Sequence, residues 1–229
     1  AAQFPGAPFE YPEKKWTYHH YDAQGTALIA ETASKCNIQR LMYMSGAGVG
    51  QNRSEPWFQA KAQGEQSIQQ ASNAWTIFRP SWIYGPTDVS LNRLRHASKL
   101  PFVFPLLGQG KETLRPIYID DVAKSVAYAL NRSSSYQQIF ELGGPESLQM
   151  KQMMQQLLQQ LHRKRILLPV PKSLVKWVAS IIEKLPGKPL LTSDGVDFIT
   201  MNVDMDVSHA SDYFPFSFTR FQNGLSKYL

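Results

Sequence analysis

The sequence has a single cysteine, Cys36, among its 229 residues. One thiol excludes a disulfide framework within the chain and any cysteine-based zinc site, and it favours a reducing compartment. No uncharged apolar run has the length needed to cross a bilayer, and the first residues lack a secretory signal pattern. We therefore expect neither a disulfide-stapled domain nor a membrane-spanning one.

Histidine is scarce as well, with five residues in the chain and no His-x-x-x-His spacing. His19 and His20 are adjacent, so on a helix their side chains point about 100° apart and cannot share an ion. Without a cysteine partner, this set does not match the ligand spacings of known metal centres. We expect no metal site.

Positive charge is in excess, with 24 Lys and Arg against 18 Asp and Glu. The basic residues are spread along the sequence apart from one short run, Arg163-Lys164-Arg165. No nucleic-acid-binding motif accompanies them, so we expect no nucleic-acid partner. A surface that docks on anionic lipid or on an acidic partner explains the charge equally well.

The hydrophobic pattern predicts an α/β fold. Short apolar runs of the kind found in buried strands alternate with segments whose apolar residues recur at helical spacing. The strands are expected at 41–44, 75–78, 116–119 and 139–142, and the helices at 17–36, 57–71 and 120–131. This alternation is typical of β-α-β units, and it predicts a Rossmann-like parallel sheet.

After Pro145 the pattern changes to helices, which predicts a smaller, mostly helical C-terminal lobe at 146–229. The preceding domain spans 1–145 and contains an insertion at about 87–113. Apolar residues of 150–161 form one helix stripe opposite glutamines; this is a partner helix or, because it lasts barely two heptads, more simply an amphipathic helix on a core. The helix at 173–185 has a wider apolar arc flanked by lysines, which fits burial in this lobe or docking on a membrane surface or partner.

The glycines of 45–50 (SGAGVG) resemble a phosphate-binding loop only superficially. Such a loop needs a tight turn followed at once by a helix whose N-terminus faces the phosphate. Here the glycine spacing is wrong, and the polar residues 51–56 do not start a helix. We reject this segment as the phosphate loop.

Five segments in a fixed order carry a family resemblance. They are 22–26 (DAQGT), 43–45 (YMS), 57–61 (WFQAK), 78–86 (FRPSWIYGP) and 115–123 (RPIYIDDVA). Together they resemble the later half of extended and atypical short-chain dehydrogenases/reductases, which are similar to NAD-dependent epimerases and dehydratases. Within that superfamily, 168–171 (LPVP), the apolar helix and 189–196 (PLLTSDGV) resemble the branch that contains the nucleotide-binding accessory subunit of respiratory complex I and its bacterial relatives.

The family begins with a strand, a glycine-rich turn and a helix that hold the adenosine and pyrophosphate of the cofactor. Nothing in this sequence corresponds to them. The resemblance thus implies that the chain starts after the family's fourth strand, and that the N-terminal Rossmann half is missing from it.

A second departure concerns the chemistry. Catalytic members place a Tyr four residues before a Lys, so that both face the nicotinamide from one side of a helix. Lys61 stands at the Lys position, but Trp57 stands where the Tyr would be. Indole donates through its N–H and cannot act as a general base. Ser45 lies where the family has a hydroxyl that binds the substrate carbonyl.

By resemblance, cofactor binding survives better than catalysis. The cofactor-binding candidates are Ser45, Lys61, Pro80, Ser81, Trp82 and Ile83. The catalytic candidates are Ser45 and Lys61, with Tyr43 and Tyr84 as stand-ins for the missing Tyr. The implied cofactor is NADP or NAD, with NADP preferred.

Two further features are open or structural in this interpretation. Asp120 and Asp121 precede a helix and are better explained as capping residues than as a catalytic pair. Arg79 and Arg115 end strands, where each could meet a phosphate or a neighbouring carboxylate.

Three hypotheses follow. The first is a non-catalytic or weakly catalytic NAD(P)(H)-binding protein with a structural or sensing role, associated with a respiratory complex or a membrane surface through 172–188. The second is an active reductase, epimerase or dehydratase acting on a sugar-nucleotide, quinone-like or lipid-like substrate. The third is a cofactor-free scaffold. The expected location is the cytoplasm, at the periphery of the inner membrane in a bacterium, or the mitochondrial matrix in a eukaryote.

Overall fold

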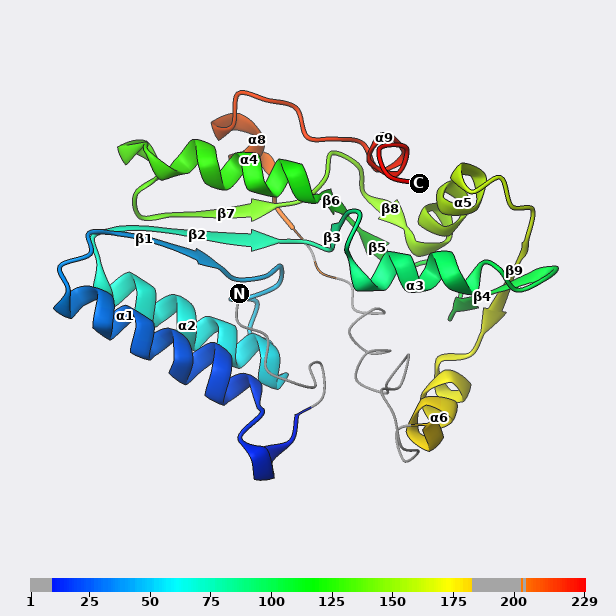
Figure 1. Ribbon diagram of the computed structural model, residues 1–229, viewed down its shortest axis with the longest axis horizontal. Coiled ribbons are helices and arrows are strands. Elements are labelled where there is room, and N and C mark those ends of the chain that lie inside the picture. Colours follow the sequence, from blue (N-terminus) through cyan, green and yellow to red (C-terminus); the bar gives the residue numbers. More distant parts are fainter. Residues whose placement is uncertain (1–9, 183–202, 204) are drawn as a thin grey trace. The chain divides into compact units, whose positions relative to one another are not determined.

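The computed structural model describes residues 10–182, 203 and 205–229, and it divides the chain into two compact units (Figure 1). The first unit consists of residues 1–81, 120–143 and 204–217. The second consists of 82–119, 144–203 and 218–229. The chain therefore passes between the units more often than the boundaries expected from the sequence, since 204–217 returns to the first unit.

The first unit is built on a parallel sheet of three strands, which confirms the expected α/β class. Its order is β1 (Arg40–Met44), β2 (Ala74–Pro80) and β7 (Gln138–Leu142). Tyr43 is paired with Ile77, and Phe78 with Phe140. Ile77, Phe78 and Phe140 are almost fully buried, as expected for strands covered on both faces.

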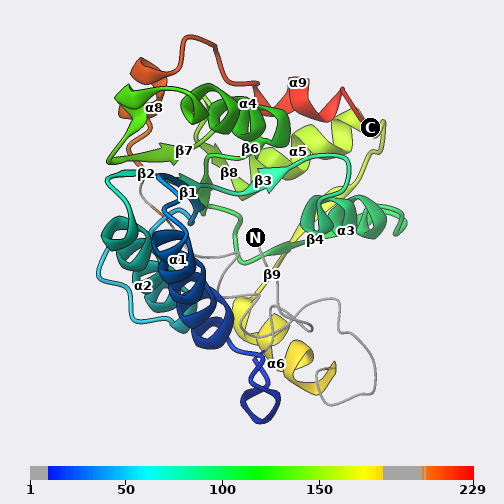
Figure 2. The same cartoon turned by 60° about the vertical axis from the view of Figure 1, so that its left-hand side comes forward.

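Helices cover both faces of this sheet (Figures 1 and 2). On one face lie α1 (Gly25–Lys35) and α2 (Pro56–Ala71). A π-helical turn, η2 (His19–Gln24), leads directly into α1. On the other face lie α4 (Ile119–Leu130) and α8 (Ser208–Tyr213). Two short 3-10 turns, η1 (Pro12–Lys14) and η3 (Ser133–Ser135), complete the unit.

One strand expected in this sheet lies elsewhere. The segment predicted at 116–119 forms only β6 (Ile117–Tyr118), which pairs with β3 (Ile83–Tyr84) in a separate two-stranded sheet of the second unit. Pro116 has no N–H to donate to a ladder, and α4 begins at Ile119, so only two residues are extended. Placing this strand in the main sheet was wrong.

The second unit contains short sheets and helices around one core. Its further elements are α3 (Val89–Ala97), β4 (Val103–Leu107), β5 (Thr113–Leu114), β8 (Leu148–Gln149), α5 (Met150–Gln160), β9 (Ile166–Val170), α6 (Lys172–Ile182) and α9 (Phe221–Leu225). β4 pairs with β9 in parallel, and β5 pairs with β8 in antiparallel fashion.

The Met-rich helix α5 is part of this core. Met153, Met154 and Leu157 are almost fully buried, and they pack in a cluster that includes Phe104 and Phe221. Its N-terminus is closed by a capping box between Gln149 and Gln152, which satisfies free backbone N–H groups. The interpretation as an amphipathic helix on a core is therefore confirmed.

Helix α6 presents apolar side chains to solvent instead. Leu174, Trp177, Val178 and Ile181 are exposed by 41–62%. The rest of the helix expected at 173–185, and the segment 189–196, lie outside the described residues. Among the helices that the structure describes, none combines the length and the apolar character that crossing a bilayer requires.

Candidate functional site

The candidate residues of the first unit lie at the carboxyl ends of β1 and β2. Ser45 follows β1, and its backbone N–H donates to Phe78 O at 2.8 Å. Ala47 N–H donates to Pro80 O at 2.9 Å, and Ser81 N–H donates to Leu142 O at 2.8 Å. These bonds hold Ser45, Pro80 and Ser81 along one sheet edge, which is the edge where open parallel sheets bind ligands.

The loop after Ser45 is a series of turns and not the start of a helix. Gly48 and Gly50 have φ of 85° and 89°, a backbone region that favours glycine. The next helix, α2, begins only at Pro56. The structure thus agrees with rejecting 45–50 as a phosphate loop, because no helix N-terminus follows the glycines.

The Ser45 hydroxyl is buried without a hydrogen-bond partner among the described residues. The residue is 6% exposed, and its Oγ contacts no donor or acceptor within bonding distance there. Leaving a buried hydroxyl unsatisfied costs stability, so such atoms need an explanation. A bound ligand that hydrogen-bonds this hydroxyl would supply one.

Lys61 is buried and held from two sides. Its Nζ lies 2.8 Å from Asp22 Oδ1 and donates to Met44 O at 3.3 Å. The ammonium therefore sits next to the end of β1, and it has more donors than these two contacts use. The carboxylate of Asp22 comes from η2, and the sequence analysis gave it no role.

Trp57 packs against the loop that follows Ser45. A Cβ built on Gly46 would lie 2.3 Å from Trp57 Cη2, so the indole ring covers the Gly46 backbone. The Phe58 ring meets the indole edge-on, with centroids 4.8 Å apart. At the position of the family's Tyr, this chain therefore has a bulky ring that closes over the loop.

The two tyrosines considered as stand-ins are both enclosed. The Tyr43 hydroxyl is wedged against Gly64 of α2, and burial raises its pKa, although the nearby Lys61 ammonium lowers it in part. In the second unit, the Tyr84 hydroxyl donates to Phe221 O at 3.3 Å, and the residue is 1% exposed. Neither environment lowers a phenol pKa toward neutrality, which a general acid/base at pH 7 requires.

The remaining candidates, Trp82 and Ile83, belong to the second unit. Trp82 O accepts from Ile117 N–H at 3.0 Å, and Ile83 pairs with Ile117. Within the described ranges, no group of three His, Cys, Asp or Glu side chains is arranged to hold a metal ion.

Arg79 meets a carboxylate of its own unit. Its Nε and Nη2 donate to Glu65 at 2.9 and 2.6 Å, and the pKa of Arg79 is raised by this bond. A Cβ on Gly50 would lie 3.2 Å from Arg79 Nη2. The ion pair thus joins α2 to β2 beneath the glycine loop and answers the alternative that the sequence left open.

Comparisons with known proteins assign the family. Residues 12–133, more than half of the chain, match the family model described as NAD(P)H-binding. The chain belongs to this NAD(P)H-binding family. The match and the structural neighbours below confirm the predicted resemblance to short-chain dehydrogenases of the epimerase/dehydratase type.

The narrower resemblance is confirmed by a curated relative. The 40 kDa subunit of mitochondrial NADH-ubiquinone oxidoreductase from Neurospora crassa is 24% identical over 82% of this chain and 49% of its own length. The chain spans about half the length of the curated relatives that it matches first.

Solved structures show the same fold. UDP-glucuronic acid 4-epimerase from Bacillus cereus, with UDP-glucuronic acid and NAD, has a TM-score of 0.65 and 18% identity over 90% of this chain and 66% of its own. dTDP-4-dehydrorhamnose reductase from Bacillus anthracis, with NADP, has a TM-score of 0.64 and 16% identity over 92% and 71%.

The Arg79–Glu65 pair yields a stability prediction. Glu65→Ala removes the partner of a largely buried guanidinium, so the free energy of unfolding should fall by about 3 kcal/mol. Glu31→Ala is the matched control, because Glu31 pairs with Lys35 on an exposed helix face, where a pair contributes about 0.5 kcal/mol. Urea denaturation measures both. Equal losses would contradict the structural role of the buried pair.

The covering of Gly46 by Trp57 yields a second prediction. Gly46→Ala should destabilise the protein by about 1–3 kcal/mol through overpacking, and it should cost far less in a Trp57→Ala background. A double-mutant cycle followed by thermal denaturation tests this coupling. Gly25→Ala is the control, since its Cβ would meet only an ordinary contact at 3.6 Å. Additive effects of the two changes would place the indole elsewhere.

Proposed function

We propose that this chain is part of a nicotinamide dinucleotide-binding subunit that holds its cofactor without the family's acid/base catalysis, in association with a respiratory complex. The observation that carries the proposal is the replacement of the family's Tyr by Trp57, four residues before Lys61 on α2. The indole has no proton to exchange as a general base. Its packing on Gly46 gives the residue a structural role instead.

The sheet edge supports cofactor binding. The unsatisfied Ser45 hydroxyl and the Lys61 ammonium both lie at the carboxyl end of β1, and Pro80 and Ser81 end the neighbouring strand. A nicotinamide dinucleotide held here would supply a hydride donor or acceptor. The residues would bind it through Ser45 Oγ and Lys61 Nζ. We propose NADP in preference to NAD, as the family resemblance implies.

The association rests on the relatives and on α6. The Neurospora crassa protein is named as a subunit of NADH-ubiquinone oxidoreductase, and the exposed apolar residues of α6 offer a docking face. We propose that 172–188 makes this contact. The location would then be the mitochondrial matrix, or the cytoplasmic side of the inner membrane in a bacterium.

An active reductase, epimerase or dehydratase is the second candidate, because Lys61 is retained and the structural neighbours include enzymes titled as UDP-sugar epimerases. It needs an acid/base in place of Trp57. Tyr43 and Tyr84 are poor substitutes, because one hydroxyl is wedged against α2 and the other is bonded within a core.

Ser45→Ala separates binding from folding. Since the hydroxyl has no partner in the described part of the chain, removing it should leave the unfolding temperature unchanged or raise it. NADPH affinity should fall about 10-fold, the usual effect of losing a ligand hydrogen bond. Titration of the full-length protein by NADPH fluorescence, with NADH in parallel, measures this. Ser67→Ala, on the exposed side of α2, is the control.

Turnover distinguishes the two candidates. The full-length protein should bind NADPH yet show no substrate-dependent oxidation with UDP-sugars or quinones. Trp57→Tyr should restore a Tyr-x-x-x-Lys pair and give measurable turnover. Turnover by the unchanged protein at rates typical of the family would end the non-catalytic proposal.

A further inference from the structure

Acidic residues are absent from two segments of the second unit. Residues 89–111 and 147–182 contain no Asp or Glu, and they hold ten of the 24 Lys and Arg. The ten are Arg93, Arg95, Lys99, Lys111, Lys151, Arg163, Lys164, Arg165, Lys172 and Lys176. The rest of the chain is therefore net acidic, and these segments carry the whole positive excess.

The parallel pairing of β4 with β9 brings the two segments together. Val103 pairs with Ile166. Arg163 donates to Arg95 O at 3.1 Å and to Ser98 Oγ, and Arg165 donates to Leu100 O at 2.6 Å. Basic residues that are about 65 positions apart in sequence thus form one surface. We call residues 99–103 and 163–166 the β4–β9 tip.

Apolar side chains project from the same tip. Phe102 is 81% exposed, Ile166 70% and Leu100 52%. Phe102 has φ of 64°, a strained conformation for a bulky residue. Its carbonyl accepts from Ile166 N–H at 2.9 Å, which fixes the strained loop to β9. The fold therefore maintains an aromatic ring in solvent at a conformational cost, although a soluble surface gains nothing from it.

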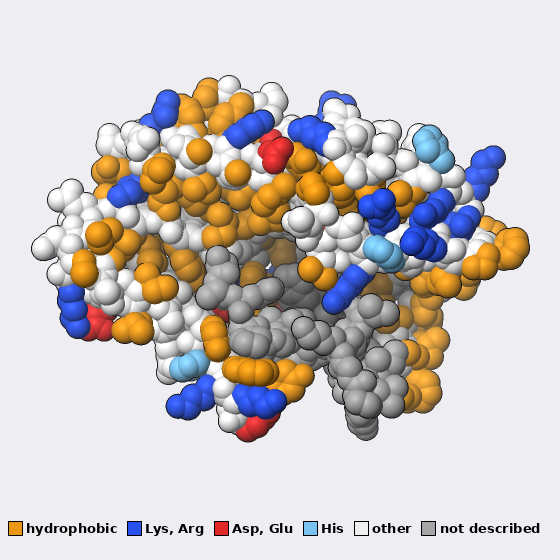
Figure 3. All heavy atoms as spheres, in the orientation of Figure 1, with side chains coloured by type: hydrophobic (Ala, Val, Ile, Leu, Met, Phe, Trp, Pro, Cys, Tyr) orange, Lys and Arg blue, Asp and Glu red, His pale blue; other side chains and the backbone are white. Residues whose placement is uncertain are grey.

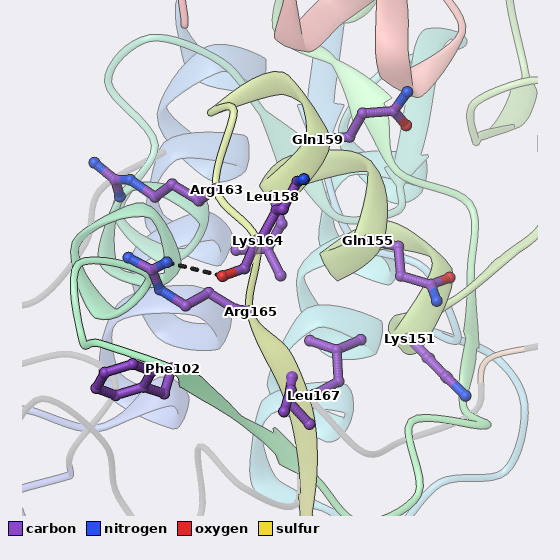
Figure 4. Close-up of a pocket in the computed structure, with 10 residues that line it drawn as sticks. Phe102, Lys151, Gln155, Leu158, Gln159, Arg163, Lys164, Arg165 and Leu167 are labelled. Atoms are coloured by element: carbon purple, nitrogen blue, oxygen red, sulfur yellow. Dashed lines mark hydrogen bonds between the residues drawn. The ribbon is translucent and has the colours of Figure 1, made fainter.

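The cations of the tip are not neutralised within the described part of the chain. No carboxylate there lies within ion-pair distance of Lys99, Arg163, Lys164 or Arg165. Figure 4 shows Arg163 and Arg165 extending to the same side as Phe102, and the adjoining groove reaches Lys151 of α5. Figure 3 shows Lys, Arg and His gathered beside hydrophobic side chains around α3, with no acidic side chain among them.

We propose that the β4–β9 tip docks on an anionic phospholipid surface. Its cations would meet the headgroup phosphates, while Phe102, Ile166 and Leu100 would enter the boundary between headgroups and acyl chains. Cations alone would fit RNA or an acidic protein as well. Exposed aliphatic side chains at the centre of the cations favour a lipid surface, because nucleic-acid sites use stacking rings and phosphate contacts. The inference does not depend on the proposed function.

Vesicle flotation of the full-length protein tests the charge contribution. It should float with phosphatidylcholine vesicles that contain phosphatidylglycerol, and much less with phosphatidylcholine alone. Lys99→Glu combined with Lys164→Glu should weaken binding about 25-fold or more, because each basic residue near an anionic surface contributes a factor of about five. Lys14→Glu with Lys124→Glu, exposed positions of the first unit, makes the same change in net charge and should bind like the unchanged protein.

Phe102→Asn tests the apolar contribution without endangering the fold, since Asn tolerates positive φ. This variant should keep or raise the unfolding temperature and should lose vesicle binding at moderate salt. Leu28→Gln removes an equally exposed apolar residue from α1 and is the control.

Several results would overturn the proposal. They are equal flotation with neutral vesicles, equal losses in the charge controls, and unchanged binding by Phe102→Asn when Trp177→Ser abolishes it, which would move the contact to α6. Binding to a single-stranded RNA or an acidic peptide, but not to vesicles, would also overturn it and would assign the tip to that partner class.

Discussion

The ion pair between Lys61 and Asp22 joins three elements around the end of β1. Lys61 comes from α2, Asp22 from the π-helical turn η2, and the carbonyl of Met44 from the strand itself. Because both charged groups are largely buried, separating them would leave a desolvated charge without a partner. The pair therefore fixes the height of α2 on the sheet. That height sets where Trp57 lies over Gly46, and how deeply Ser45 is enclosed beside it.

The same end of the sheet explains how a family site can persist without its reaction. Lys61 has a structural partner, so this lysine is retained even where no tyrosine needs its charge. Trp57 fills the space above Gly46 with a ring that packs well but does not exchange protons. Ser45 has no such internal role among the described residues, and a buried hydroxyl without a partner is the feature that structure alone does not justify.

Charge in this protein is separated by unit rather than by sequence neighbourhood. The basic segments of the second unit occur on either side of α4 and β7, which belong to the first unit. Only Arg163-Lys164-Arg165 is recognisable as a cluster in the sequence. The net charge of +6 is thus a property of one surface, and the strained backbone of Phe102 places an apolar ring within it.

The sequence by itself determined the α/β class, the strands β1, β2 and β7, the helices α2 and α5, and the loss of the family's Tyr at Trp57. These follow from local periodicity and from a motif of fixed spacing, which neighbouring residues define. The tertiary structure alone decided the partner of Lys61, the carboxylate that meets Arg79, the position of Ile117 outside the main sheet, and the convergence of the basic segments. Each of these depends on contacts between distant residues, and their register is set by packing and strand pairing, which local sequence patterns do not encode.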